Sequence, residues 1–189
     1  QRVKGAWRTK RWTECVEGLV ILARCGEPCL LRVVRSFDSD NRSRLTLCEE
    51  FDERAETDWA IRFLRGYLTA DLLYMRPKFA RDLESRDELI KEAAADLSAT
   101  ASAPRNPFVD AQLPLWAILL EQVKRADTER VLRDLRGLIN EGPPDEYLVR
   151  LLIVGELRNA KRPADLLAEV PAARAAIAKR TEEIGLHTV

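Results

Sequence analysis

The clearest pattern along the chain is the three- and four-residue spacing of apolar side chains between residues 58 and 75. The residues at this spacing are Ile61, Leu64, Leu68, Leu72 and Met75. Such spacing places side chains on one face of an α-helix. Aromatic residues widen that face, namely Trp59, Phe63 and Tyr67. The segment is therefore predicted to be a helix with little exposed surface.

Two consecutive helices are predicted further along, each with its own start or stop signals. Asp127 or Thr128 can cap the first helix, and Gly142 stands where a left-handed C-terminal cap is expected. The second helix begins at Pro144 or Asp145, because proline fits the first helical turn and an acidic side chain is favoured there. Since the connection is short, we expect the two helices to pack antiparallel.

Helical spacing extends over most of the remaining chain. Gly26 is expected to end the first helix, and Pro163 and Pro171 each suit a first helical position, so the C-terminal region is predicted to contain two helices. The segment 114–123 is apolar on nearly all sides and is expected at the centre of the C-terminal half. The helices predicted in this way cover residues 3–24, 78–97 (one long helix or two short ones), 114–123, 164–169 and 172–184.

The segment 29–34 is ambiguous. Its sequence, CLLRVV, is rich in β-branched residues and would also suit a strand that pairs with residues 44–48 across a turn-rich stretch. We favour a helix, because the other predicted elements are helical.

The fold class that follows is all-α: an irregular multi-helix bundle, or a short array of helical hairpins, with about eight helices. Residues 98–106 are small and polar and include a proline, which is typical of a boundary. We therefore predict an N-terminal helical half over 1–97, a linker over 98–111 and a C-terminal half over 112–189, with one continuous domain as the alternative.

Composition and charge narrow the class of protein. The 189 residues are 46% hydrophobic and 33% charged, which indicates a globular chain. Because 31 basic and 31 acidic side chains cancel, no overall field attracts nucleic acid or anionic lipid. The longest uncharged runs reach about half of the roughly 20 residues that a membrane-spanning helix needs. With no apolar signal segment near the start, we expect an intracellular protein without a membrane span.

The four cysteines are candidate metal ligands or disulfide partners. Only one close pair, Cys25 and Cys29, occurs; Cys15 and Cys48 are more distant in sequence. Structural zinc sites usually use two such pairs. We therefore favour reduced, buried thiols and expect no metal site and no cofactor.

Catalytic motifs are not evident. The chain has no GxxxxGK[ST], GxGxxG or GxSxG segment, and its single histidine is His187. A serine or cysteine nucleophile needs a positioned base, which a histidine so near the end of the chain is poorly placed to supply. An enzyme is not favoured.

Two segments of opposite charge stand out. Near the start, basic residues alternate with tryptophans and no acidic residue precedes Glu14. Residues 37–58 contain eight acidic and three basic side chains. We predict that both segments face partners. Their candidate residues are Arg2, Lys4, Trp7, Arg8, Lys10, Arg11, Trp12, Glu49, Glu50, Asp52, Glu53 and Glu56.

The best-supported hypothesis is a non-enzymatic helical interaction module, or a structural subunit, whose partners are other protein subunits. Basic side chains with indole rings also suit RNA or single-stranded nucleic acid, so nucleic-acid binding through the N-terminal segment is the first alternative. A simpler interpretation has Trp7 and Trp12 facing the core and the basic face paired with the acidic segment. A helical-bundle enzyme or ligand carrier is the second alternative.

Overall fold

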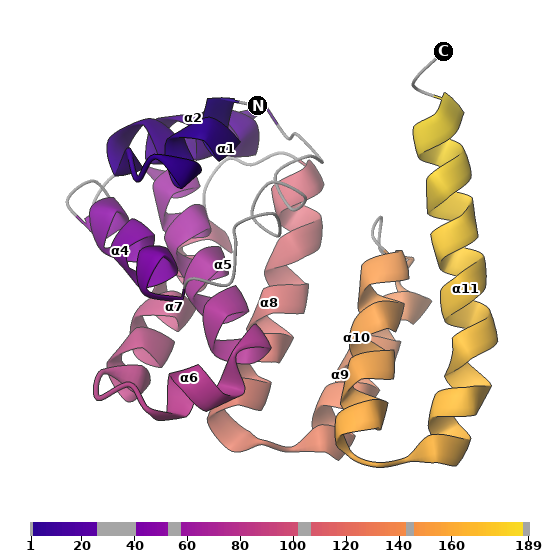
Figure 1. The fold of residues 1–189 in the computed structure, drawn as a ribbon. Coiled ribbons are helices and arrows are strands. Elements are labelled where there is room, and N and C mark those ends of the chain that lie inside the picture. The colour runs from indigo at the N-terminus through magenta and orange to yellow at the C-terminus, as the bar shows by residue number, and fades with distance from the viewer. Residues whose placement is uncertain (1, 26–40, 53–57, 102–106, 143–145, 187–189) are drawn as a thin grey trace. The chain divides into compact units, whose positions relative to one another are not determined.

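The computed structural model describes residues 2–25, 41–52, 58–101, 107–142 and 146–186, and within these ranges all regular elements are α-helices (Figure 1). The all-α prediction is confirmed, with ten helices in this part of the chain. None of these helices combines the length and apolar character needed to cross a lipid bilayer.

The chain divides into two compact units, unit 1 (Gln1–Lys124) and unit 2 (Arg125–Val189). We had expected a linker over 98–111, but residues 98–101 belong to helix α7 and residues 107–111 to helix α8. The segment 114–123, expected at the centre of the C-terminal half, lies in unit 1 instead.

Unit 1 begins with two short helices, α1 (Arg2–Arg8) and α2 (Trp12–Arg24), where one helix over 3–24 was predicted. That prediction is wrong because Lys10 adopts a left-handed conformation, with φ 54°. The Lys10 amide donates to the Trp7 carbonyl at 3.1 Å, and the Arg11 amide donates to the Ala6 carbonyl at 2.9 Å. These two bonds form a Schellman cap with lysine at the usual glycine position, and they end α1.

The remaining helices of unit 1 surround α5 (Trp59–Met75), which contacts α2, α4 and α7. Twelve of its seventeen residues are buried, including Ile61, Leu64, Leu68 and Leu72 of the predicted spacing, whereas Met75 is 39% exposed. Asp58 caps α5 by accepting a hydrogen bond from the Ala60 amide at 2.9 Å. The surrounding helices are α4 (Asn41–Asp52), α6 (Pro77–Arg81), α7 (Arg86–Ala101) and α8 (Pro107–Arg125).

The bounds of α4, α6 and α7 decide between the alternatives that the sequence left open for residues 44–48 and 78–97. Residues 44–48 are helical, so they do not pair as a strand with residues 29–34, which lie outside the described residues. The segment 78–97 forms parts of two helices rather than one long helix, because the chain turns between Arg81 and Arg86.

Unit 2 contains α9 (Thr128–Asn140), α10 (Glu146–Asn159) and α11 (Pro163–Leu186), each running antiparallel to the one before (Figure 1). The predicted cap of α9 is confirmed, because the Asp127 carboxylate accepts a hydrogen bond from the Arg130 amide at 3.1 Å. Gly142 has φ 73°, as its predicted role requires. The predicted start of α10, Pro144 or Asp145, lies outside the described residues.

Helix α11 is continuous where two helices, 164–169 and 172–184, were predicted, and Pro171 lies inside it. Proline at this position removes the amide that would bond to the Leu167 carbonyl. Both residues are exposed, with Leu167 at 72%, so water can reach that carbonyl. The helix therefore tolerates the proline.

Ion pairs of two arginines link the helices of unit 2 to one another. Arg150 of α10 donates to Glu146 at 2.7 Å and to Glu169 of α11 at 2.8 Å. Arg162, between α10 and α11, pairs with Glu129 of α9 and with Asp165 at 2.6 Å.

Candidate functional site

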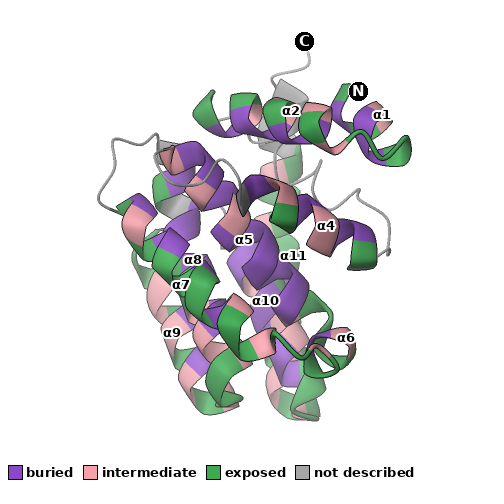
Figure 2. Cartoon of the chain, turned by 90° about the vertical axis from the view of Figure 1, so that its left-hand side faces the viewer, coloured by how far each residue is buried: buried purple, intermediate pink, exposed green. Residues whose placement is uncertain are grey.

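The five basic residues singled out near the start of the chain are all exposed. They lie on α1 and on the turn that leads into α2, and they are Arg2, Lys4, Arg8, Lys10 and Arg11. The buried residues of α1 are Val3, Ala6 and Trp7, on the side of the helix away from Lys4 and Arg8. Figure 2 shows the exposed sides of α1 and α2 facing away from the other helices of unit 1. We refer to this exposed side of α1, the turn and α2 as the outer face.

Close packing holds α1 against α2. A Cβ atom placed on Gly18 of α2 would overlap Cγ2 of Val3. Val3 is buried and β-branched, so its side chain has little freedom to move aside. Glycine at position 18 therefore allows α1 to lie directly on α2, which holds the backbone that carries the basic residues in place.

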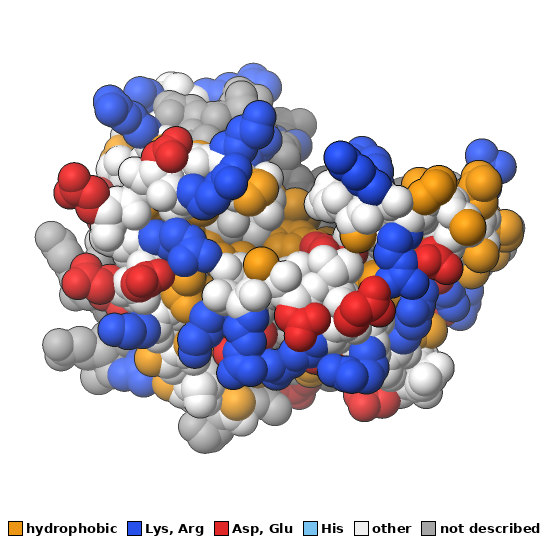
Figure 3. Space-filling model, turned by 90° about the horizontal axis from the view of Figure 1, so that it is seen from below, with side chains coloured by type: hydrophobic (Ala, Val, Ile, Leu, Met, Phe, Trp, Pro, Cys, Tyr) orange, Lys and Arg blue, Asp and Glu red, His pale blue; other side chains and the backbone are white. Residues whose placement is uncertain are grey.

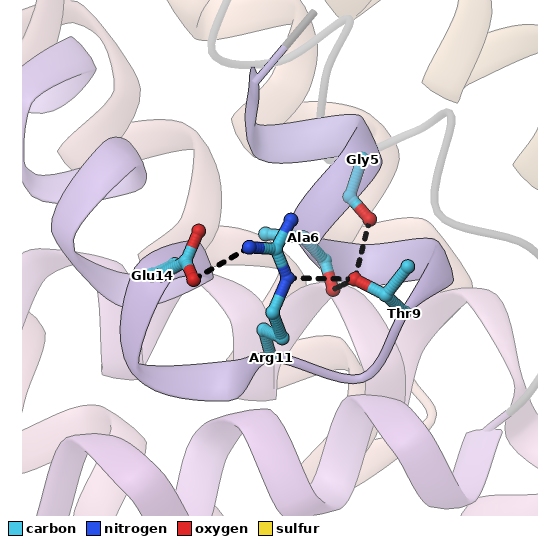
Figure 4. Close-up of polar contacts among 5 residues, drawn as sticks. All are labelled: Gly5, Ala6, Thr9, Arg11 and Glu14. Atoms are coloured by element: carbon cyan, nitrogen blue, oxygen red, sulfur yellow. Dashed lines mark hydrogen bonds and ion pairs between the residues drawn. The ribbon is translucent and has the colours of Figure 1, made fainter.

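Arg11 is engaged within its own hairpin (Figure 4). Its Nη1 donates to Oε1 of Glu14 at 2.7 Å, and its Nε donates to Oγ1 of Thr9 at 3.0 Å. The Thr9 hydroxyl in turn donates to the Gly5 carbonyl at 2.9 Å. Arg11 therefore stabilises the turn, and Glu14 balances its charge.

The other four cations differ from Arg11. The side chains of Arg2, Lys4, Arg8 and Lys10 form no ion pair or hydrogen bond with any residue that the structure describes. By contrast, basic and acidic side chains adjoin one another over much of the surface visible in Figure 3. The outer face thus presents a local excess of positive charge.

The two tryptophans contribute to packing. Trp7 is only 7% exposed, and Trp12 is partly exposed. Their ring centroids lie 5.5 Å apart in an edge-to-face arrangement. Trp7 is thereby withdrawn from stacking on an unpaired base, as the interpretation in which the tryptophans face the core requires, whereas Trp12 is only partly buried.

The acidic segment is described only in part. Glu49 is exposed, and Glu50 accepts a hydrogen bond from the Thr13 hydroxyl of α2 at 3.0 Å. This contact places the last turn of α4 beside the first turn of α2. Asp52 ends α4, but its side chain lies outside the described residues, as do Glu53 and Glu56.

The sequence reasoning missed Ile21, which is 60% exposed on α2. Ile21 follows the exposed Glu17 by four residues, so the two lie on the same exposed side of α2. An isoleucine among the polar residues on this side of the predicted helix could have been identified from the sequence.

The described cysteines are free thiols, namely Cys15, Cys25 and Cys48. Burial raises the pKa of Cys15 to about 12, and Cys48 accepts a hydrogen bond from Thr69 at 3.6 Å. Cys29 and His187 lie outside the described residues. Among the residues that are described, no three His, Cys, Asp or Glu side chains lie close enough to share a metal ion.

No protein family, curated protein or solved structure matches this chain. The outer face combines four exposed cations on a closely packed helical hairpin with one exposed isoleucine on its second helix.

Proposed function

We propose that this chain is a non-enzymatic helical interaction module that binds another protein through the outer face of α1 and α2. The observation that carries the proposal is the group of four exposed cations, Arg2, Lys4, Arg8 and Lys10, which have no ion-pair partner among the described residues. Like charges held close together repel one another. Carboxylates of a bound protein would relieve that repulsion and orient the complex.

The interior of unit 1 supports a structural rather than a catalytic use of its charged residues. Arg44 of α4 donates to Asp71 of α5 at 2.8 Å, and both side chains are buried. Arg65 of α5 holds both oxygens of Asp96 on α7, at 2.5 and 2.7 Å. These carboxylates are occupied in joining helices, so they are poorly suited to proton transfer.

These ion pairs also favour a binding role because they make the scaffold rigid. Helix α5 is fixed to α4 and α7 by the buried pairs, and Arg24 of α2 pairs with the capping residue Asp58. A surface that is already ordered loses less conformational entropy when a partner binds.

Binding of nucleic acid is the competing use of the same cations, since phosphates would neutralise them equally well. The burial of Trp7 counts against the stacking that single-strand binders use. We therefore rank protein binding first and let the experiment decide between the two.

The experiment compares the proteins that co-purify with the full chain expressed in its source cells. The test variant is Lys4→Gln, Arg8→Gln and Lys10→Gln combined. The control is Lys78→Gln, Lys91→Gln and Lys124→Gln combined, which removes three exposed lysines elsewhere on unit 1. Neutral replacements are chosen because acidic ones near the C-terminal end of α1 would disfavour the helix.

We expect a defined set of proteins to be retained by the wild type and the control and lost by the test variant. Circular dichroism must show that both variants keep the wild-type helix content. The proposal is wrong if both variants retain the same proteins. If nuclease treatment of the wild type abolishes the interaction, the nucleic-acid alternative replaces it.

A further inference from the structure

We infer that the partner presents an acidic amphipathic helix to the outer face, with carboxylates over α1 and a large apolar side chain against Ile21. This inference rests on the proposed function and names the chemistry of its partner. It follows from four features of the hairpin and its surroundings: the spacing of the cations, the open space at Gly5, the exposure of Ile21, and the acidic side chains that interrupt the basic region.

The cations form a compact group. Lys4 and Arg8 lie four residues apart on one face of α1, whereas Arg2, two residues before Lys4, is exposed on a different side of the helix. Lys10 follows in the turn. Since α1 has only seven residues and rises by about 1.5 Å per residue, the group suits two or three carboxylates rather than a long polyanion.

Gly5 lies between these cations and leaves the backbone accessible. A Cβ atom at Gly5 would meet no other atom within 4 Å, so the space above it is open. A carboxylate of the partner can therefore approach α1 closely and contact cations on both sides.

Ile21 supplies the exposed apolar side chain of this surface. Single exposed apolar residues are common and carry no meaning alone. Ile21 differs because it lies three residues along α2 from Gly18, where Val3 at the start of α1 packs, which is about 4.5 Å of helical rise. A partner helix laid along the hairpin could therefore meet Ile21 and the cations of α1 together.

Acidic side chains within and beside the hairpin favour a protein over nucleic acid. Glu17 is exposed on α2, and Glu49 is exposed on α4, whose last turn touches α2 through Thr13 and Glu50. A phosphate backbone carries one negative charge per nucleotide and would be repelled by these carboxylates. A protein segment can place basic or neutral residues opposite them.

The test uses a synthetic helical peptide of about 16 residues, which spans about 24 Å. Four glutamates occupy one face of its first two turns, and two leucines occupy the same face of its last two turns. Companion probes are the same peptide with serines for the leucines, an oligothymidylate of equal net charge, and vesicles containing an anionic lipid. Binding to the full chain is measured by fluorescence anisotropy, with sedimentation for the vesicles.

We expect the leucine peptide to bind most tightly of the four probes. The Lys4→Gln, Arg8→Gln and Lys10→Gln variant should weaken its binding about tenfold, and Ile21→Ser should weaken it about fivefold. Ile21→Ser should leave the already weaker serine peptide unaffected. The control at Lys78, Lys91 and Lys124 should bind as the wild type does.

The inference is overturned if oligothymidylate or the vesicles bind as tightly as the leucine peptide, if no probe binds, or if Ile21→Ser has no effect. Its failure is distinguishable from failure of the proposed function. If co-purification depends on the outer face but the peptide does not bind, the module still binds protein and only the partner's chemistry is wrong.

Discussion

Three residues other than glycine adopt a left-handed conformation in the described part of the chain: Lys10, Ala126 and Lys161. For residues with a Cβ this conformation costs about 1–2 kcal/mol. Each of these residues follows the end of a helix, where the chain must change direction. At Lys10 the reversal brings α1 back onto α2 and so presents the cations of the outer face together.

Replacing Lys161 by glycine should stabilise unit 2. Lys161 has φ 55°, and the Lys161 and Arg162 amides donate to the Arg158 and Leu157 carbonyls in a Schellman cap. We expect Lys161→Gly to raise the free energy of unfolding of unit 2 by about 1 kcal/mol, because glycine adopts this conformation without strain. Urea unfolding followed by circular dichroism measures the change. Ala160→Gly is the control and should not stabilise; equal stabilisation by both variants would refute the explanation.

The cysteines should differ sharply in reactivity. Burial raises the pKa of Cys15 to about 12, so at pH 8 almost none of it is thiolate, whereas Cys25 is exposed. Because the thiolate is the reactive form, we expect iodoacetamide to modify Cys25 and to leave Cys15 unmodified until urea unfolds the chain. Peptide mass spectrometry reads both sites in one sample. Modification of Cys15 at the rate of Cys25 in the folded protein would contradict its burial.

At the scale of the element, α5 organises unit 1 because it packs closely against its neighbours. A Cβ atom at Gly66 would lie 3.1 Å from the Ala93 carbonyl oxygen and 3.1 Å from Cβ of Asp96, both on α7. The adjacent Arg65 pairs with Asp96 across the same contact. The short distance between the helices and the geometry of the ion pair therefore depend on one glycine.

Gly66→Ala should separate these helices. Alanine normally favours a helix by about 1 kcal/mol over glycine. Here we expect a net loss of about 1–3 kcal/mol, because the Ala93 carbonyl belongs to the backbone and cannot turn aside. Gly5→Ala is the matched control, since its Cβ would meet nothing within 4 Å and the variant should not be destabilised. Thermal unfolding compares the two. A Gly66→Ala variant as stable as the Gly5→Ala variant would rule out tight packing here.

The elements show which features the sequence could predict. Helices α5 and α9 were predicted because their apolar spacing is a local signal, as is the capping residue Asp127 of α9. The break at Lys10 was not, because neither glycine nor proline marks it and the conformation depends on the packing of α1 onto α2. The prediction that a new helix begins at Pro171 was wrong, because α11 continues through this exposed proline.

The candidate site was predictable only in part, for a similar reason. The composition of the N-terminal segment shows that it is basic. The ion pairs of its cations depend on side-chain contacts, and the spacing of residues in the sequence does not give these contacts. Arg11 is neutralised by Glu14, whereas Lys4 and Arg8 are not. The exposure of Ile21 likewise follows from the side of α2 that packs against the rest of unit 1.

At the scale of the whole molecule, each unit has a core of its own. Phe63 and Leu64 are fully buried in unit 1, and Leu135 is fully buried in unit 2. A compact domain as small as unit 2 has marginal stability, because it buries a smaller share of its surface than a larger one does. We therefore expect the two units to unfold separately.

Leu135→Ala tests this expectation. The substitution should cost unit 2 about 2–5 kcal/mol through lost burial and the cavity it leaves. In native-state hydrogen exchange, amides of α9, α10 and α11 should lose protection while those of α5 and α7 keep theirs. Leu167→Ala is the control: it removes the same atoms from a side chain that is 72% exposed and should change protection little. Parallel loss of protection in α5 would mean that the chain unfolds as one cooperative unit. In that case a partner bound to the outer face would stabilise α9, α10 and α11 as well.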